Sequence, residues 1–150
     1  MVRDMAFDNP TAAQLSQVIS QVTAPAFLLG AVAGFISVLI SRMNRIIDRS
    51  QALNAIAEED KIRGLLKSDI PRLKRRALLL NKAILFSTIS AIVTSALVII
   101  AFMSAYFNMA HEYGVAVFFI VALGFFTAAL VKLAREITIA LNEYDHFSSS

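Results

Sequence analysis

Three long apolar runs without a single charged residue constrain the fold of this chain more than any other feature. A helix that rises about 1.5 Å per residue needs roughly 20 residues to cross a hydrocarbon core about 30 Å thick. The runs at residues 22–41, 83–107 and 114–131 all come close to that length. A transmembrane barrel would instead show alternating segments of about ten residues. The sequence therefore predicts an all-α membrane protein with three transmembrane helices.

The composition argues against several kinds of chemistry. The chain has no cysteine, and its two histidines, His111 and His146, lie far apart in the sequence. Thiolate nucleophiles and disulfides are therefore excluded, and a site with several imidazole ligands is not expected within one chain. The motifs of serine hydrolases, phosphate-binding glycine loops and zinc proteases are missing as well. We expect no enzymatic activity, no metal and no cofactor.

The distribution of Lys and Arg predicts how the chain is oriented. Residues 42–82 hold eleven of the fourteen basic residues against five acids, whereas residues 1–21, 108–113 and 132–150 each carry a net charge of −1. Basic loops stay on the cytoplasmic side of a membrane. The sequence thus predicts a membrane protein with its N-terminus outside and its C-terminus in the cytoplasm. Because topology accounts for the positive charge, nucleic-acid binding is not expected.

The polar segments suggest further helices. The pattern of residues 1–21 predicts a short helix on the outer surface of the membrane. Pro25 either begins the first span or kinks it. Residues 42–82 predict an antiparallel helical hairpin in the cytoplasm, and residues 132–150 a cytoplasmic tail. One arm of the hairpin shows apolar positions that alternate spacings of four and three, as in a coiled coil. These positions are Leu66, Ile70, Leu73, Ala77, Leu80 and Ile84.

Several segments resemble a known family. They are the APAFLL motif at residues 24–29, the SRMNRIIDR motif at residues 41–49, the basic stretch 72–82 and the REI motif at residues 135–137. The chain is similar, from about Gln17 to Leu141, to an uncharacterised family of small three-span bacterial membrane proteins, domain of unknown function 2721. This resemblance implies three spans in a bacterial membrane, so the predicted topology becomes that of an inner-membrane protein with a periplasmic N-terminus and a cytoplasmic C-terminus. The family supplies no activity to carry over.

One face of the first predicted helix carries small and polar residues at helical spacing. Gly30 and Gly34 within it form a Gly-x-x-x-Gly motif, which lets two helix backbones approach closely in lipid. We expect this face to pack against another helix, within the chain or between subunits of a homo-oligomeric assembly or scaffold. The alternative is that it lines an ion channel or small-solute pore in a homo-oligomer. The full set of residues is Thr23, Ala26, Gly30, Gly34, Ser37, Ser41, Asn44 and Asp48.

Hydroxyl groups recur along the second span, where we expect them to bond to their own helix or to a neighbouring one. They belong to Ser87, Ser90, Thr94, Ser95 and Ser104.

Charged residues gather where the spans end on the predicted cytoplasmic side. One group is expected to form an ion network at the membrane boundary, or else only to anchor the helix ends. It consists of Arg42, Arg45, Asp48, Arg49, Arg135 and Glu136. A second group precedes the second span and is expected to contact anionic lipid head groups. It consists of Arg72, Lys74, Arg75, Arg76 and Lys82.

Overall fold

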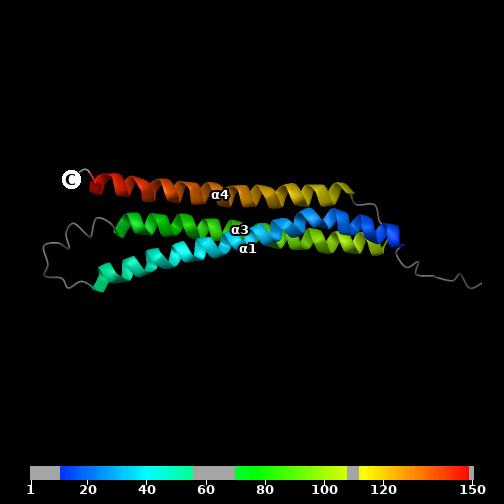
Figure 1. Cartoon of the computed structure of the whole chain (residues 1–150), viewed down its shortest axis with the longest axis horizontal. Coiled ribbons are helices and arrows are strands. Elements are labelled where there is room, and N and C mark those ends of the chain that lie inside the picture. Colours follow the sequence, from blue (N-terminus) through cyan, green and yellow to red (C-terminus); the bar gives the residue numbers. More distant parts are fainter. Residues whose placement is uncertain (1–10, 56–69, 108–111, 149–150) are drawn as a thin grey trace, which may run out of the picture.

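The computed structural model describes residues 11–55, 70–107 and 112–148, and these form three long helices. Helix α1 spans Ala12–Ala55, α3 spans Ile70–Tyr106 and α4 spans Glu112–Ser148. The helices lie side by side in alternating directions (Figure 1). Helix α3 packs along both of its neighbours, whereas α1 and α4 contact each other little. The predicted all-α class is confirmed for the described residues.

Each of the three helices contains a stretch long and apolar enough to cross a membrane. Large apolar side chains also point away from the bundle, among them Phe27, Ile99 and Ile120, which are 77%, 62% and 68% exposed. Monomeric soluble proteins rarely expose contiguous apolar surface of this kind. The chain therefore has the build of a multi-pass membrane protein with three apolar helices.

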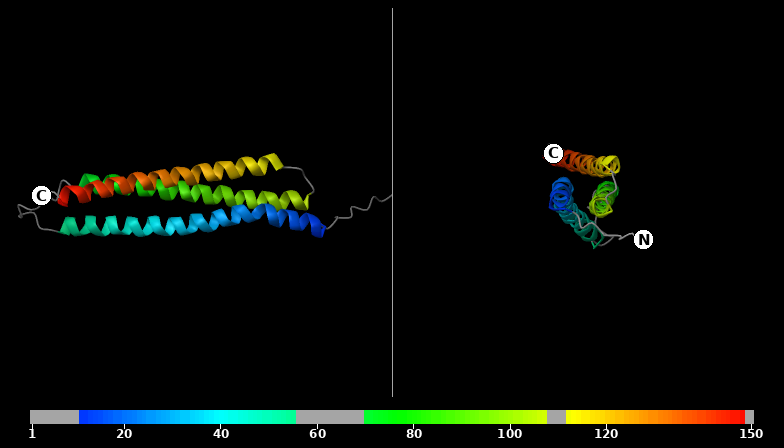
Figure 2. Two further views of the ribbon diagram at one scale, coloured as in Figure 1. Left: turned by 45° about the horizontal axis from the view of Figure 1, so that its top comes forward. Right: turned by 90° about the vertical axis from the view of Figure 1, so that its right-hand side faces the viewer.

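Helix α1 continues without a break through the segment predicted as a separate surface helix. Residues 12–21 belong to the same helix as the first apolar run, and Pro25 lies inside it. Proline removes one backbone hydrogen bond and tends to bend a helix. The N-terminal part of α1 is indeed inclined to the rest of the helix (Figure 2). Residues 1–10 of the predicted segment lie outside the described residues.

All three helices extend beyond the apolar runs that were predicted to cross the membrane. Helix α1 reaches Ala55 and α3 begins at Ile70, so both arms of the predicted hairpin are helical over these stretches. The connection at residues 56–69, which includes Leu66 of the predicted coiled-coil positions, lies outside the described residues. Most of the predicted C-terminal tail belongs to α4, which continues to Ser148.

Buried residues recur every seven positions along each helix. This spacing keeps one face of a helix turned toward its neighbours over many turns. The buried series are Val18, Pro25, Val32, Leu39 and Ile46 in α1; Leu73, Leu80, Ser87, Thr94 and Ala101, and also Ala83, Ser90 and Leu97, in α3; and Ala122, Ala129 and Glu136 in α4.

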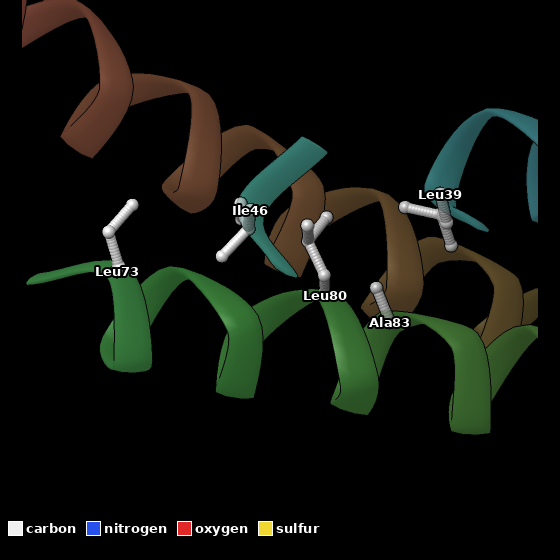
Figure 3. Packing of buried hydrophobic residues seen from close by; sticks show 5 residues of the cluster. All are labelled: Leu39, Ile46, Leu73, Leu80 and Ala83. Carbon is white, nitrogen blue, oxygen red and sulfur yellow. The ribbon is translucent and has the colours of Figure 1, made fainter. Parts of the chain in front are cut away.

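The core between α1 and α3 is built from aliphatic side chains. Leu39 and Ile46 of α1 extend toward Leu73, Leu80 and Ala83 of α3 (Figure 3), and all five are 5% exposed or less. The predicted positions Leu73 and Leu80 are thus buried. Burying one such leucine contributes about 1.5 to 3 kcal/mol relative to exposure to water, although lipid lowers this contribution.

The packing of α3 against α4 relies on small residues. Ser87, Ser90, Ala122 and Ala129 are all fully buried. The Ser90 hydroxyl donates a hydrogen bond of 2.8 Å to the backbone carbonyl of Ala122 in α4. Small side chains allow helices in a membrane to approach closely, and hydroxyl groups can link them.

Candidate functional site

The most unusual residue in the described part of the chain is Glu136, whose side chain is completely buried. It occupies the next position, after Ala122 and Ala129, in the buried seven-residue series of α4. A buried carboxylate is costly unless charged partners and hydrogen bonds compensate for lost hydration. The packing of α4 therefore requires cationic groups from the neighbouring helices at this level.

Two arginines supply this compensation. Arg42 of α1 donates from Nη1 to Oε2 of Glu136 at 2.5 Å. Arg76 of α3 donates from Nε to Oε1 at 2.9 Å, and its Nη2 lies 2.8 Å from the same oxygen. Both carboxylate oxygens are engaged, and the three helices meet in one ionic contact. We call Arg42, Arg76 and Glu136 the ionic cluster.

The members of the ionic cluster differ in their access to the surface. The side chain of Glu136 is 0% exposed, that of Arg76 is 16% exposed and that of Arg42 is 37% exposed. Two guanidinium groups and one carboxylate give the cluster a net charge of +1. The side of the cluster open to the surroundings is therefore cationic, and Arg42 presents it.

The predicted ion network is only partly assembled. Arg42 and Glu136 are bonded to each other, as the prediction required. Four other members, Arg45, Asp48, Arg49 and Arg135, have exposed side chains and contribute no bond to Glu136 within the described residues. Of the six residues predicted to form the network, Arg42 and Glu136 pair with each other in the described part of the chain.

The third member of the ionic cluster, Arg76, belongs to the group of residues that the sequence predicts to contact lipid head groups. It is half-buried and binds Glu136. A sequence pattern could have separated it from that group, since it stands seven residues before Ala83 in a series that continues to Ser90 and Leu97. The remaining members of the group are all exposed, and their contact with lipid stays a prediction: Arg72, Lys74, Arg75 and Lys82.

The small and polar face of α1 points away from the other two helices. All eight of its residues are exposed. A side-chain carbon placed on Gly30 or Gly34 would meet no atom within 4 Å outside its own helix. Within the described residues, this face therefore does not pack against a helix of the same chain, and packing between subunits stays a prediction. We call this surface, from Thr23 to Asp48, the α1 outer face.

The C-terminal half of the α1 outer face is polar and slightly hollowed. A shallow, open concavity there is lined by Ser37, Ile40, Ser41, Asn44, Arg45 and Asp48. The Ser37 hydroxyl is satisfied by a 3.2 Å hydrogen bond to the carbonyl of Ala33 in its own helix. Nearer the N-terminus of the same face, the Thr23 hydroxyl donates a hydrogen bond to the carbonyl of Ile19 in the same manner. Such bonds let hydroxyl groups face lipid or a second helix without loss.

The hydroxyl groups of the second span behave as predicted. Ser87 and Thr94 bond to carbonyls of α3 itself, while Ser90 reaches across to α4. Ser95 and Ser104 also bond within α3. In the described segments, no group of three or more His, Asp or Glu residues is arranged to hold a metal ion.

Comparison with known proteins places the chain in a family. A family model described as a protein of unknown function, DUF2721, matches residues 22–146. The chain belongs to this family. The matched range includes the whole ionic cluster and all but the last residues of α4. No curated protein and no solved structure matches the chain significantly.

Proposed function

We propose that this protein is a non-catalytic inner-membrane module that forms a homo-oligomeric assembly or scaffold through the α1 outer face. The observation that carries the proposal is that this face is small, polar and exposed, although most of it lies within the uncharged apolar run of residues 22–41. A lipid-facing helix surface has no need of glycines four residues apart. A surface that receives another helix does.

The geometry favours a close helix pair. Apolar burial drives association only weakly in lipid, so helices associate there through tight packing and hydrogen bonds. The open space at Gly30 and Gly34 lets a second backbone approach that of α1 closely. Further along, the hydroxyls of Ser37 and Ser41 and the amide of Asn44 supply donors and acceptors on the same face.

A second copy of α1 suits this face better than an unrelated helix does. Copies of one membrane protein share the same orientation, so a two-fold axis along the membrane normal places each residue near its own counterpart. Small residues then oppose small residues along the whole stripe. The Asn44 side chain, which both donates and accepts hydrogen bonds, can pair with itself across such an axis.

An ion channel or small-solute pore is the second candidate, favoured by the polar concavity around Ser37, Asn44 and Asp48. Three helices per chain do not enclose a wet channel, so this function requires several copies whose α1 outer faces point inward. Arg45 would then stand near one mouth of the pore. Exchanging Arg45 for Glu should reverse the ion preference in single-channel recordings, and an unchanged reversal potential would exclude this role.

The same proposal includes the orientation of the chain and its lipid contacts. A periplasmic N-terminus places the exposed cations Arg72, Lys74, Arg75 and Lys82 at the cytoplasmic surface, where anionic head groups lie. Each cation near such a surface contributes about 1 kcal/mol of attraction.

The absence of cysteine in the natural chain allows a direct test of the assembly. A single Ser37→Cys variant can form a disulfide only with another copy, and we expect efficient oxidative cross-linking in membranes. The control is Ser95→Cys, which alters an equally exposed serine of α3 whose hydroxyl also bonds to its own helix. Equal cross-linking at both positions would indicate random collision and refute the α1 interface.

A substitution at the glycine motif gives the complementary test. Gly34→Leu should convert the assembly to monomers in native mass spectrometry of the detergent-solubilised protein, without loss of helicity. Gly124→Leu is the matched control, because Gly124 of α4 is exposed and equally free of neighbours. A monomeric natural protein, or an assembly that tolerates Gly34→Leu, would contradict the proposal. Four or more copies would justify flux assays for the pore.

A further inference from the structure

Arg42 is the one member of the ionic cluster that reaches the surface, and its guanidinium is only partly used. Within the described residues, one Nη1 contact to Glu136 accounts for its bonding. A guanidinium carries five N–H donors in a planar fork. The side chain is 37% exposed, so donors that do not face Glu136 are accessible from outside the bundle.

We propose that Arg42 and Arg45 together bind one phosphate group. Arg45 follows Arg42 by three residues, which places both side chains on neighbouring positions of one flank of α1. The side chain of Arg45 is exposed. Arg45 also lines the hollow on the α1 outer face, whereas Arg42 belongs to the ionic cluster. Both arginines come from one chain, so the site does not depend on self-assembly.

The charges around Arg42 and Arg45 suit a phosphate. The three residues of the ionic cluster sum to +1, and the charge of Arg45 is balanced by that of Asp48, which lines the same hollow. A phosphodiester, which carries −1 near neutral pH, therefore brings the site close to neutrality. Arginine binds phosphate oxygens through pairs of parallel N–H donors, which chloride cannot use in the same way.

The buried carboxylate also prepares the site. The bond from Glu136 holds one end of the Arg42 guanidinium, so this side chain loses less rotamer freedom when it binds an anion. Side chains fixed before binding give tighter complexes than free ones. Glu136 is therefore a positioning residue for the site, and Arg42 and Arg45 are the binding residues.

The site lies at the level where lipid phosphates lie. Arg42 is the first residue after the uncharged run 22–41, so it stands at the boundary of the hydrocarbon layer. Basic sites between helices at such a boundary bind phosphate head groups. A soluble phosphate compound arriving from the aqueous side would meet the same donors, and the two sources are separated by experiment.

The test is ligand titration of the full chain in detergent, followed by native mass spectrometry. Phosphatidylglycerol should remain bound at one molecule per chain, and diacylglycerol, which lacks the phosphate, should not. A parallel titration with inorganic phosphate, at constant ionic strength, should raise the thermal unfolding midpoint only if the natural ligand is soluble. Binding of neither phosphate probe would overturn the proposal.

Two variants locate the binding. Arg45→Gln does not touch the ionic cluster and should weaken phosphatidylglycerol binding about fivefold, the effect expected for one juxtamembrane cation. The matched control is Arg135→Gln, an exposed arginine of α4 adjacent in sequence to the cluster residue Glu136 and outside the lipid-contacting group, which should weaken binding clearly less than Arg45→Gln does. Arg42→Gln leaves Glu136 paired with Arg76 and should weaken binding at least as much as Arg45→Gln. Equal weakening by Arg45→Gln and Arg135→Gln would show only diffuse attraction and refute a defined site.

Discussion

Removing the carboxylate of Glu136 is the most severe single change that the structure predicts. Glu136→Ala leaves Arg76, which is only 16% exposed, with two donors that no longer meet a carboxylate. It also frees Arg42 from α4 and opens space in a fully buried position. Breaking a buried ion pair by deleting one partner costs about 3 to 5 kcal/mol, because the remaining charge stays desolvated after it has lost the opposite charge. We expect Glu136→Ala to lower the free energy of unfolding by an amount in this range.

The two arginines should show graded effects, because their exposure differs. Arg76→Ala removes two of the three contacts to the carboxylate and should cost about 2 to 4 kcal/mol, within the range for breaking a partly compensated buried pair. Arg42→Ala removes one contact from a side chain that is 37% exposed, so about 1 to 2 kcal/mol is expected. The exposed Arg135, adjacent to Glu136 in α4, serves as control, and Arg135→Ala should change stability by no more than about 0.5 kcal/mol.

The assay is reversible unfolding in mixed micelles, with increasing fractions of sodium dodecyl sulfate and helicity followed by circular dichroism. A joint replacement of all three cluster residues by apolar ones of similar volume should recover most of the stability, since it removes the buried charges together. If Glu136→Ala falls within about 1 kcal/mol of Arg135→Ala, the carboxylate is hydrated rather than buried, and the account of the cluster fails.

Two further changes test the contact between α3 and α4. Ser90→Ala removes the hydrogen bond to the carbonyl of Ala122 and should lower the free energy of unfolding by about 0.6 to 2 kcal/mol in the same assay. The hydroxyl of Ser95 bonds only to its own helix, so Ser95→Ala should be near neutral. Ala129→Leu forces a large side chain into a fully buried position and should lower the free energy of unfolding by about 1 to 3 kcal/mol. The same substitution at the exposed Ala134 should have little effect. Equal effects at Ala129 and Ala134 would contradict the packing described.

The three apolar helices could be predicted because crossing a hydrocarbon layer demands a minimum length without charge. Residues 22–41, 83–107 and 114–131 meet that demand by themselves, whatever they pack against. The ends of the helices could not be located in this way. Helix α1 continues to Ala55 because its apolar positions keep their helical spacing after the charges begin.

The direction in which α1 faces its neighbours was harder to predict. Its buried side carries Val32, Leu39 and Ile46, and the opposite side carries Gly30 and Gly34. In a soluble helix the polar side would reveal itself, but in lipid both sides are apolar or small, and hydropathy does not distinguish core from membrane surface. The Gly-x-x-x-Gly motif predicts a surface suited to close approach, but it does not say whether the partner belongs to the same chain.

The ionic cluster explains why an otherwise apolar bundle holds one particular alignment. Buried series with a seven-residue repeat allow two helices to slide by seven residues and still bury leucine and alanine against similar side chains. Such a slip of α4 would remove Glu136 from the level of Arg42 and Arg76, and it would separate a buried carboxylate from both of its guanidinium partners. A polar group at one core position is known to select register at some cost in stability.

Because apolar burial drives helix association only weakly in lipid, this selection of register by the ionic cluster matters more here than in water. Glu136 therefore fixes the relative height of all three helices, and it thereby also fixes where Arg42 and the α1 outer face stand along the bundle.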